Sequence, residues 1–221
     1  MLFPRRKDDL KKGGAGGNTL KALMVDVDGV IIVNPDPRGW SATLEADLGL
    51  SPDRLQAAFF APHWAEIVHG RACLYERLDA ALRDIAPHLT PGELCRYWFE
   101  HDAHLDHALL AELAAFRAKG VALHLATVQD HERARYLWQD LLLSQRFDAM
   151  HYAADLGFTK PADGFFAEIE RRTGFAPGEM FLIDDKSENV EAARRRGWPA
   201  AVWTGKRRLW DVLRDAGAAC A

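Results

Sequence analysis

The chain has 221 residues, 48% of them hydrophobic, and a formal net charge of −4. That length and composition are typical of a globular protein with one domain and an insertion, or with two small domains. The negative charge argues against a general attraction to nucleic acid, and no apolar run approaches the roughly 18 residues that span a bilayer. The three cysteines are scattered, as in a reducing compartment, so we expect a cytoplasmic protein without membrane or nucleic-acid partners.

Residues 1–18 combine mixed charge with a glycine-rich run at positions 13–17. A glycine loop that holds phosphate follows a strand and opens a helix, whereas this run comes before the first apolar segment. We therefore expect residues 1–18 to be a flexible N-terminal tail rather than a phosphate-binding loop.

The first apolar segment, residues 21–33, predicts a buried strand that is interrupted by Asp26 and Asp28 and then by Gly29. Asp is a poor strand former, and carboxylates beside a buried strand are costly unless they are paired or bind a metal ion. Residues two apart in a strand lie on the same side, so both side chains could converge on one point. A hard cation such as Mg²⁺, or a retained proton, would relieve their repulsion.

From about residue 40 to residue 106 the apolar residues recur at helical spacing, with no strand pattern. Ser51 stands where it would cap one helix, and Thr90 with Glu93 has the pattern of a capping box at the start of another. We predict a helical cap domain over residues 37–106.

Three histidines near the end of this segment, His101, His104 and His107, suggest a zinc site. On a helix, however, their spacing spreads them over about 120°, which is too wide for one ion. A solvated hinge between the cap and the rest of the chain is the better interpretation.

After residue 106, predicted strands and helices alternate. Strands are expected at 121–126, 147–152, 180–183 and 199–203, and helices at 109–119, 131–143, 164–173, 187–196 and 206–216. Such alternation is typical of a parallel sheet with right-handed crossovers. We therefore predict an α/β fold with a Rossmann-like, three-layer α/β/α core, formed by residues 19–36 and 107–221.

Polar residues stand where these strands end. Thr127 closes the second strand, Lys160 follows the third, and Asp184 and Asp185 follow the fourth. In open parallel sheets, ligands bind outside the carboxyl ends of the strands. We expect all four residues to join the two carboxylates of the first strand in one site.

In chain order, these residues form four motifs: Asp26-x-Asp28-Gly29-Val30, Thr127, Lys160-Pro161 and Asp184-Asp185-x-x-x-Asn189. The set resembles the ordered motifs of the haloacid dehalogenase (HAD) superfamily, over nearly the whole chain beyond residue 18. The predicted helical cap resembles the C1 cap of subfamily IA. Residues 126–137 and the last motif look closest to phosphatases related to α-D-glucose-1-phosphate phosphatase.

The resemblance implies catalytic roles for single positions. Asp26 would be the nucleophile that forms an aspartyl-phosphate, and Asp28 would be the general acid and base. Thr127, Lys160 and the backbone of Val128 would bind the phosphoryl group. Val128 departs from the family pattern, in which Asn usually follows Thr.

The resemblance also implies a bound Mg²⁺ ion. Its ligands would be Asp26, Asp185 and the backbone carbonyl of Asp28, with Asp184 as an auxiliary or indirect ligand. Carboxylate and carbonyl oxygens are the donors that Mg²⁺ prefers.

Together these features predict a Mg²⁺-dependent phosphatase that hydrolyses a small phosphomonoester, such as a sugar phosphate or a nucleotide. Three alternatives remain open: a phosphomutase with the same intermediate, a haloacid dehalogenase, and a non-catalytic binding protein with this fold. The expected partner is a small phosphate ester, and the chain could act as a monomer or a homodimer.

Overall fold

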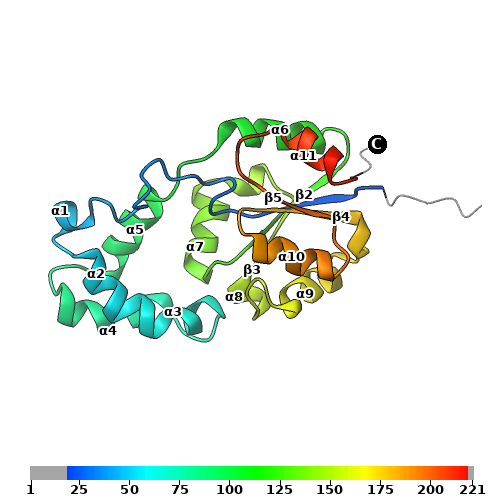
Figure 1. Ribbon diagram of the computed structural model, residues 1–221. Helices are drawn as coiled ribbons and strands as arrows, with labels where there is room; N and C mark the ends of the chain where they lie inside the picture. Colours follow the sequence, from blue (N-terminus) through cyan, green and yellow to red (C-terminus); the bar gives the residue numbers. More distant parts are fainter. Residues whose placement is uncertain (1–18, 219–221) are drawn as a thin grey trace, which may run out of the picture.

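A computed structural model describes residues 19–218, so the tail expected at residues 1–18 lies outside the described residues. The sheet has five parallel strands in the order β3-β2-β1-β4-β5 (Figure 1). They are β1 (Ala22–Val25), β2 (Ala122–Thr127), β3 (Ala149–Tyr152), β4 (Met180–Asp184) and β5 (Ala200–Val202). In the central strand, Val25 pairs with Leu125 on one side and with Ile183 on the other. The carboxyl ends of β1, β2 and β4 therefore lie side by side.

Helices cover both faces of the sheet and complete three layers (Figure 1). One face carries α6 (His107–Arg117) and α11 (Leu209–Asp215), and the other carries α8 (Ala153–Leu156), α9 (Asp163–Thr173) and α10 (Ser187–Arg195). Within β1, Leu23 and Val25 pack on the first face, whereas Ala22 and Met24 pack on the second. Because both faces are buried, the strand is apolar throughout instead of alternating. The predicted Rossmann-like α/β core is confirmed.

The helix predicted over residues 131–143 is interrupted. It consists of α7 (His131–Arg135), a π-helical turn η2 (Tyr136–Asp140) and a 3-10 turn η3 (Leu143–Gln145). Leu142, between the last two, has φ of 56°, a left-handed conformation that ends the helix. A further 3-10 turn, η4 (Pro177–Glu179), leads into β4. No helix within residues 19–218 is long and apolar enough to cross a membrane.

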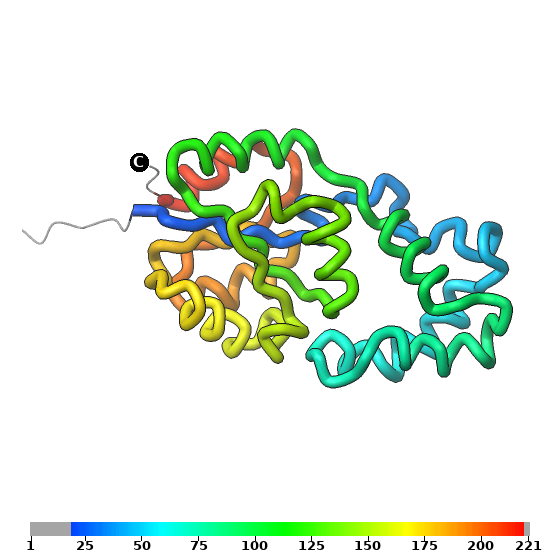
Figure 2. The backbone as a smooth tube through the Cα atoms, turned by 180° about the vertical axis from the view of Figure 1, so that it is seen from behind, coloured from blue at the N-terminus to red at the C-terminus, as the bar shows by residue number. Residues whose placement is uncertain are grey.

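The segment between β1 and α6 forms a helical cap beyond the carboxyl ends of the strands (Figures 1 and 2). Its elements are α1 (Leu44–Leu48), α2 (Pro52–Leu55), η1 (Gln56–Phe60), α3 (Ala61–Val68), α4 (Leu74–Ile85) and α5 (Pro91–His101). These helices share a hydrophobic cluster of their own, which includes Phe59, Leu78, Leu94 and Trp98. The predicted helical cap is therefore confirmed as a packed unit.

The capping pattern of these helices is confirmed at one of two positions. The N–H of Glu93 donates to Oγ1 of Thr90 at 3.3 Å, and the N–H of Thr90 donates to Oε2 of Glu93 at 2.9 Å, which completes the capping box of α5. Ser51 occupies the N-cap of α2, but its side chain makes no capping hydrogen bond.

Two crossing segments join the cap to the core and run antiparallel to each other. The N–H of Val33 donates to the carbonyl of His104 at 2.9 Å, and the N–H of Asp106 donates to the carbonyl of Ile31 at 2.8 Å. Among residues 19–218, His101, His104 and His107 belong to no cluster of potential metal ligands. His101 ends α5, His104 lies in the returning segment and His107 begins α6, and the hinge stays a prediction.

Candidate active site

Lys160 connects the ends of three neighbouring strands. Its Nζ lies 2.9 Å from Oδ1 of Asp26, just after β1, and 2.5 Å from Oδ2 of Asp184, the last residue of β4. It also donates to the carbonyl of Ala126 in β2 at 2.9 Å. All three charged side chains are buried, so each depends on the others for charge compensation. Residues that the sequence placed at separate strand ends are thus in direct contact.

Asp184 and Asp185 have different surroundings although they are adjacent. Asp184 accepts from Lys160 through Oδ2, and through Oδ1 from the N–H of Lys186 at 2.9 Å and the Nδ2 of Asn189 at 2.8 Å. Both of its oxygens are therefore engaged within the protein. Asp185 is exposed, and its carboxylate lies over the turn at Gly29. Asp185 is the carboxylate that remains available to a ligand.

Gly29 leaves room for that carboxylate. A Cβ atom at this position would lie 2.6 Å from Oδ2 of Asp185, and the glycine has φ of +77°. A side chain here would have to displace Asp185 and would also strain the backbone. The sequence motif therefore needs glycine for two separate reasons.

Three carboxylates form a group that fits a hard divalent cation. One oxygen each from Asp26, Asp184 and Asp185 lies within 4.8 Å of the others. Lys160 supplies a single positive charge against three acids, so negative charge remains uncompensated. All candidate donors are carboxylate oxygens, which suit Mg²⁺.

The pKa values of these acids reflect the same imbalance. Burial, opposed by Lys160 and reinforced by Asp184, raises the pKa of Asp26 to about 7. Burial and the neighbouring Asp184 also raise the pKa of Asp185. For Asp184, burial opposes ionisation, but Lys160 and the hydrogen bonds outweigh it and the pKa is lowered. A cation beside Asp26 and Asp185 would favour their ionised forms.

The Asp28 carboxylate is not part of the three-acid group. Because β1 ends at Val25, before both acids, the side chains of Asp26 and Asp28 are not held at one point as the strand pattern suggested. Asp28 instead accepts from Nε2 of Gln129 at 2.6 Å. Its side chain reaches solvent, yet enough protein surrounds it that desolvation raises its pKa, against the charge of Arg133 and the Gln129 amide.

Thr127 and Val128 follow the strand next to β1. Thr127 is fully buried, and its Oγ1 lies 3.3 Å from the same Gln129 amide. Val128 is half-buried. Gln129 is itself 4% exposed and links Thr127 to Asp28, a connection that the sequence did not reveal. A glutamine two residues beyond a strand end belongs to no recognisable pattern.

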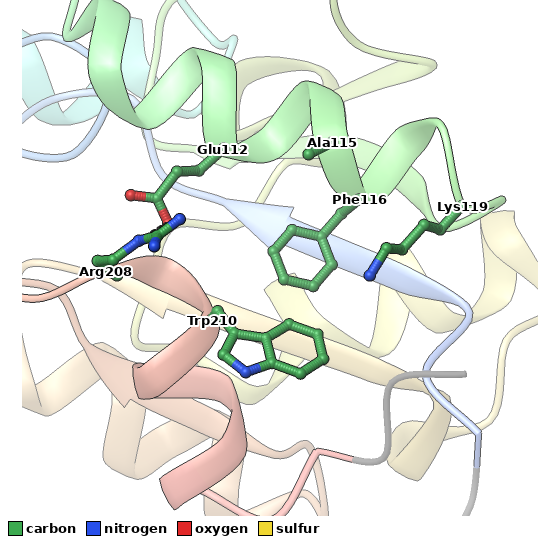
Figure 3. Close-up of a pocket in the computed structure, with 6 residues that line it drawn as sticks. All are labelled: Glu112, Ala115, Phe116, Lys119, Arg208 and Trp210. Carbon is green, nitrogen blue, oxygen red and sulfur yellow. Dashed lines mark ion pairs between the residues drawn. The ribbon is translucent and has the colours of Figure 1, made fainter.

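A surface pocket of about 190 Å³ lies elsewhere, between α6 and α11 (Figure 3). Phe116 stacks on Trp210 with ring centroids 5.9 Å apart, and Lys119 lies 5.0 Å from the centre of the Trp210 ring. None of the acids at the strand ends lines this pocket. The candidate catalytic residues lie in the acid cluster at the strand ends and not in this pocket.

The family follows from a comparison with protein-family models. The model described as haloacid dehalogenase-like hydrolase matches residues 20–197. That span includes the acid cluster, Lys160 and the whole helical cap, so the chain belongs to the haloacid dehalogenase-like hydrolase family. A comparison with curated proteins finds no significant match.

Solved structures share the fold at low sequence identity. A HAD family enzyme from Bacteroides thetaiotaomicron, in complex with magnesium and inorganic phosphate, matches with a TM-score of 0.72 and 16% identity, over 86% of this chain and 98% of that one. A HAD-like family hydrolase from Porphyromonas gingivalis matches with a TM-score of 0.68 and 19% identity, over 91% and 100%. YfnB from Bacillus subtilis, bound to magnesium, matches with a TM-score of 0.62 and 15% identity, over 90% and 99%. These identities establish similarity of fold alone.

Proposed function

We propose that the protein is a Mg²⁺-dependent phosphatase that hydrolyses a small phosphomonoester through a phosphorylated Asp26. The observation that carries the proposal is the pairing of Asp26 with buried Lys160 beside two further acids, while Asp28 is held separately by Gln129. This arrangement supports Asp26 as the nucleophile and Asp28 as the proton carrier. Phosphate monoesters hydrolyse extremely slowly in water, so both functions are needed.

In the first step, a carboxylate oxygen of Asp26 attacks phosphorus and the bond to the leaving oxygen breaks. Asp28 gives its proton to that oxygen, so the product leaves as an alcohol. Lys160 and Thr127, with the backbone N–H of Val128, balance and orient the phosphoryl oxygens. Covalent catalysis divides one difficult displacement into two easier ones.

In the second step, water attacks the phosphorus of the aspartyl-phosphate. Asp28, now ionised, takes a proton from that water as the new phosphorus–oxygen bond forms. The bond between Asp26 and phosphorus breaks, inorganic phosphate leaves, and the carboxylate of Asp26 is restored. The proton on Asp28 is then available for the next turnover.

Asp26, Asp185 and the backbone carbonyl of Asp28 would hold the magnesium ion, and Asp184 would act indirectly. The contacts support this division, since both oxygens of Asp184 already accept hydrogen bonds, whereas Asp185 is exposed to solvent. A bound Mg²⁺ supplies positive charge to a reaction in which an anionic nucleophile meets an anionic ester.

We further propose that the cap spans residues 37–106 and the core spans residues 19–36 and 107–221, as in C1-capped members of subfamily IA. A sugar phosphate is the first substrate class to test, because the motifs resemble those of α-D-glucose-1-phosphate phosphatase. The cap would select the leaving group and exclude water.

The test is phosphate release from a panel of sugar phosphates, nucleotides and an aryl phosphate, with Mg²⁺ and with chelator. We expect release that requires Mg²⁺ and is lost in Asp26→Asn, while the exposed control Asp84→Asn keeps full activity. Isomerised product would favour a phosphomutase, and halide release from haloacids without Mg²⁺ would favour a dehalogenase. No reaction with any compound and no Mg²⁺ binding would leave a non-catalytic binding protein.

A further inference from the structure

Arg133 is a buried arginine that reaches from the core to the cap. It lies in α7 and is 1% exposed. Its Nη1 donates to the carbonyl of Phe99 at 3.0 Å, and its Nη2 donates to the carbonyl of Asp102. The carboxylate of Asp102 is 3.3 Å away. One core side chain therefore holds the last turn of α5 and the residue that follows it.

The surroundings of this guanidinium suit a cation. The last carbonyls of a helix have no partner within the helix and carry partial negative charge, so they attract a positive group. The guanidinium carbon also lies 5.3 Å from the centre of the Phe99 ring and 5.5 Å from that of Tyr136. Aromatic faces stabilise a desolvated cation. Arg133 thus joins rings and carbonyls from both sides of the cap–core boundary.

Arg133 contacts the cap at the point where the chain returns to the core. Asp102 begins the segment that returns from the cap to the core, and that segment pairs with the outgoing one next to Ile31 and Val33. Four residues before Arg133, Gln129 donates to Asp28. The segment from Gln129 to Arg133, which leads into α7, therefore contacts the candidate acid at one end and the end of the cap at the other.

We propose that Arg133 is a positioning residue, which fixes the end of α5, and through it the cap, relative to the carboxylates of the core. The backbone carbonyls of Phe99 and Asp102 are its principal partners. The Asp102 carboxylate is longer-range and partly exposed, and contributes less. The effect of Arg133 on turnover rests on the proposed phosphatase function, whereas its effect on cap position does not.

The direct test is a distance measurement between spin labels in the cap and the core. Labels at Asp84→Cys in α4 and Glu191→Cys in α10 occupy exposed positions, in a chain that also carries Cys73→Ser and Cys220→Ser. In the labelled chain that retains Arg133, we expect a narrow distribution of distances between the two labels. In Arg133→Met we expect a broad one. Arg133→Lys keeps the charge but cannot donate to both carbonyls in a fixed geometry, so an intermediate width is expected.

The control is Arg171→Met in α9, at an exposed position where the guanidinium pairs with Glu168 of the same helix at 2.6 Å. It should leave the distribution unchanged. Asp102→Asn should also change it little, because both carbonyl contacts remain. A distribution as narrow in Arg133→Met as in the parent chain would overturn the proposal. If Arg133→Met does not fold, an unchanged width in Arg133→Lys has the same meaning.

Kinetics provide a second readout, with an aryl phosphate as substrate and inorganic phosphate as a competing ligand. Arg133→Met should raise KM and lower kcat/KM by up to roughly 100-fold, as misplacement of a cap can do. Inhibition by inorganic phosphate, which would contact only the strand ends, should not change. A lower kcat with unchanged KM would indicate loss of folded protein and would contradict positioning. Absence of activity in the parent chain would count against the phosphatase, and the spin-label result would still decide the role of Arg133.

Discussion

Gln129 and Asp28 are 101 positions apart in the chain, yet Nε2 of Gln129 lies 2.6 Å from Oδ2 of Asp28. The same amide lies 3.3 Å from Oγ1 of Thr127. One side chain thus links the proposed proton carrier to the proposed phosphate-binding hydroxyl. Burial raises the pKa of Asp28, and the charge of Arg133 and the Gln129 amide oppose that rise.

Gln129→Met should impair catalysis without unfolding the protein. The variant removes the donor that orients Asp28. General acid–base catalysis contributes roughly 10²- to 10⁴-fold to the rate, and a misoriented Asp28 should lose part of that contribution. We therefore expect kcat to fall by about 10- to 100-fold. Loss of the amide should also raise the pKa of Asp28, because its ionised form loses a hydrogen bond. The alkaline limb of the kcat/KM profile, where Asp28 must be protonated for the first step, should therefore move upward. Gln139→Met, at an exposed position, is the control. An unchanged rate and profile would show that Gln129 does not orient Asp28.

Gly29→Ala and Gly39→Ala should separate backbone strain from loss of the metal site. Both glycines have positive φ, +77° and +75°, so each substitution should cost about 1–2 kcal/mol of stability. Only at Gly29 would the new Cβ meet Asp185, whereas nothing lies within 4 Å at Gly39. The Mg²⁺-induced rise in melting temperature should therefore disappear in Gly29→Ala and persist in Gly39→Ala. Equal Mg²⁺ responses would contradict the role of Asp185 as a ligand.

Asp184→Asn should lower stability, whereas Asp185→Asn should mainly remove the response to Mg²⁺. Asp184 is fully buried and accepts hydrogen bonds from Lys160, Lys186 and Asn189, so its neutralisation should destabilise the protein by about 1–3 kcal/mol, although Lys160 keeps its pairing with Asp26. Asp185 is exposed and forms no salt bridge with any other residue among 19–218, so Asp185→Asn should change stability by less than about 0.5 kcal/mol without metal. Denaturant unfolding with and without Mg²⁺ measures both effects. We expect Asp185→Asn to lose the stabilisation by Mg²⁺, and its retention would assign the ion to other ligands.

The pair His124 and His151 should make the protein sensitive to acid. Nδ1 of His124 lies 3.0 Å from Nε2 of His151, so one ring donates and the other accepts. Burial, reinforced by His124, lowers the pKa of His151 from 6.5 to about 4. Between these values the unfolded chain binds a proton that the native chain does not. The free energy of unfolding should therefore fall as pH decreases from 6.5 toward 4, by up to roughly 3 kcal/mol.

His151→Gln removes that titration and should flatten the dependence of unfolding free energy on pH in this range. His107→Gln, at an exposed position, should leave the slope as it is. Urea unfolding at several pH values provides the measurement. Equal slopes for the two variants would mean that His151 is protonated in the native state as readily as in the unfolded chain.

Much of the fold was predictable because its signals are local. The apolar run before Asp26 and the alternation of strands and helices after residue 106 follow from burial, and they fix a parallel sheet. Because ligands bind at the carboxyl ends of parallel strands, the sequence also predicted that Lys160, Asp184 and Asp185 belong to one site. The interruption at Leu142 escaped prediction, because apolar spacing continues through it and a left-handed leucine has no sequence signature.

The contacts missed within the site are those between distant segments. Gln129 and Arg133 are ordinary helix-start residues by their spacing, and only the folded chain brings them to Asp28 and Asp102. The strand pattern placed Asp26 and Asp28 on one side, but β1 ends before them, so the rule of alternation no longer applies. The sequence could not show which of the two acids, Asp184 or Asp185, is available to a metal ion, because both are aspartates at the end of one strand. The structure distinguishes them, since Asp184 is buried and accepts three hydrogen bonds, whereas Asp185 is exposed.

The most direct test of the central claim is a rapid acid quench of Asp28→Asn with p-nitrophenyl phosphate and Mg²⁺, followed by peptide mapping. Nitrophenolate leaves without a proton, so the first step should proceed, whereas the second step lacks its base. The account predicts a burst of nitrophenolate and a phosphoryl group on the peptide that contains Asp26. Release of nitrophenolate with no phosphoryl group on Asp26, or with the group on another residue, would contradict it.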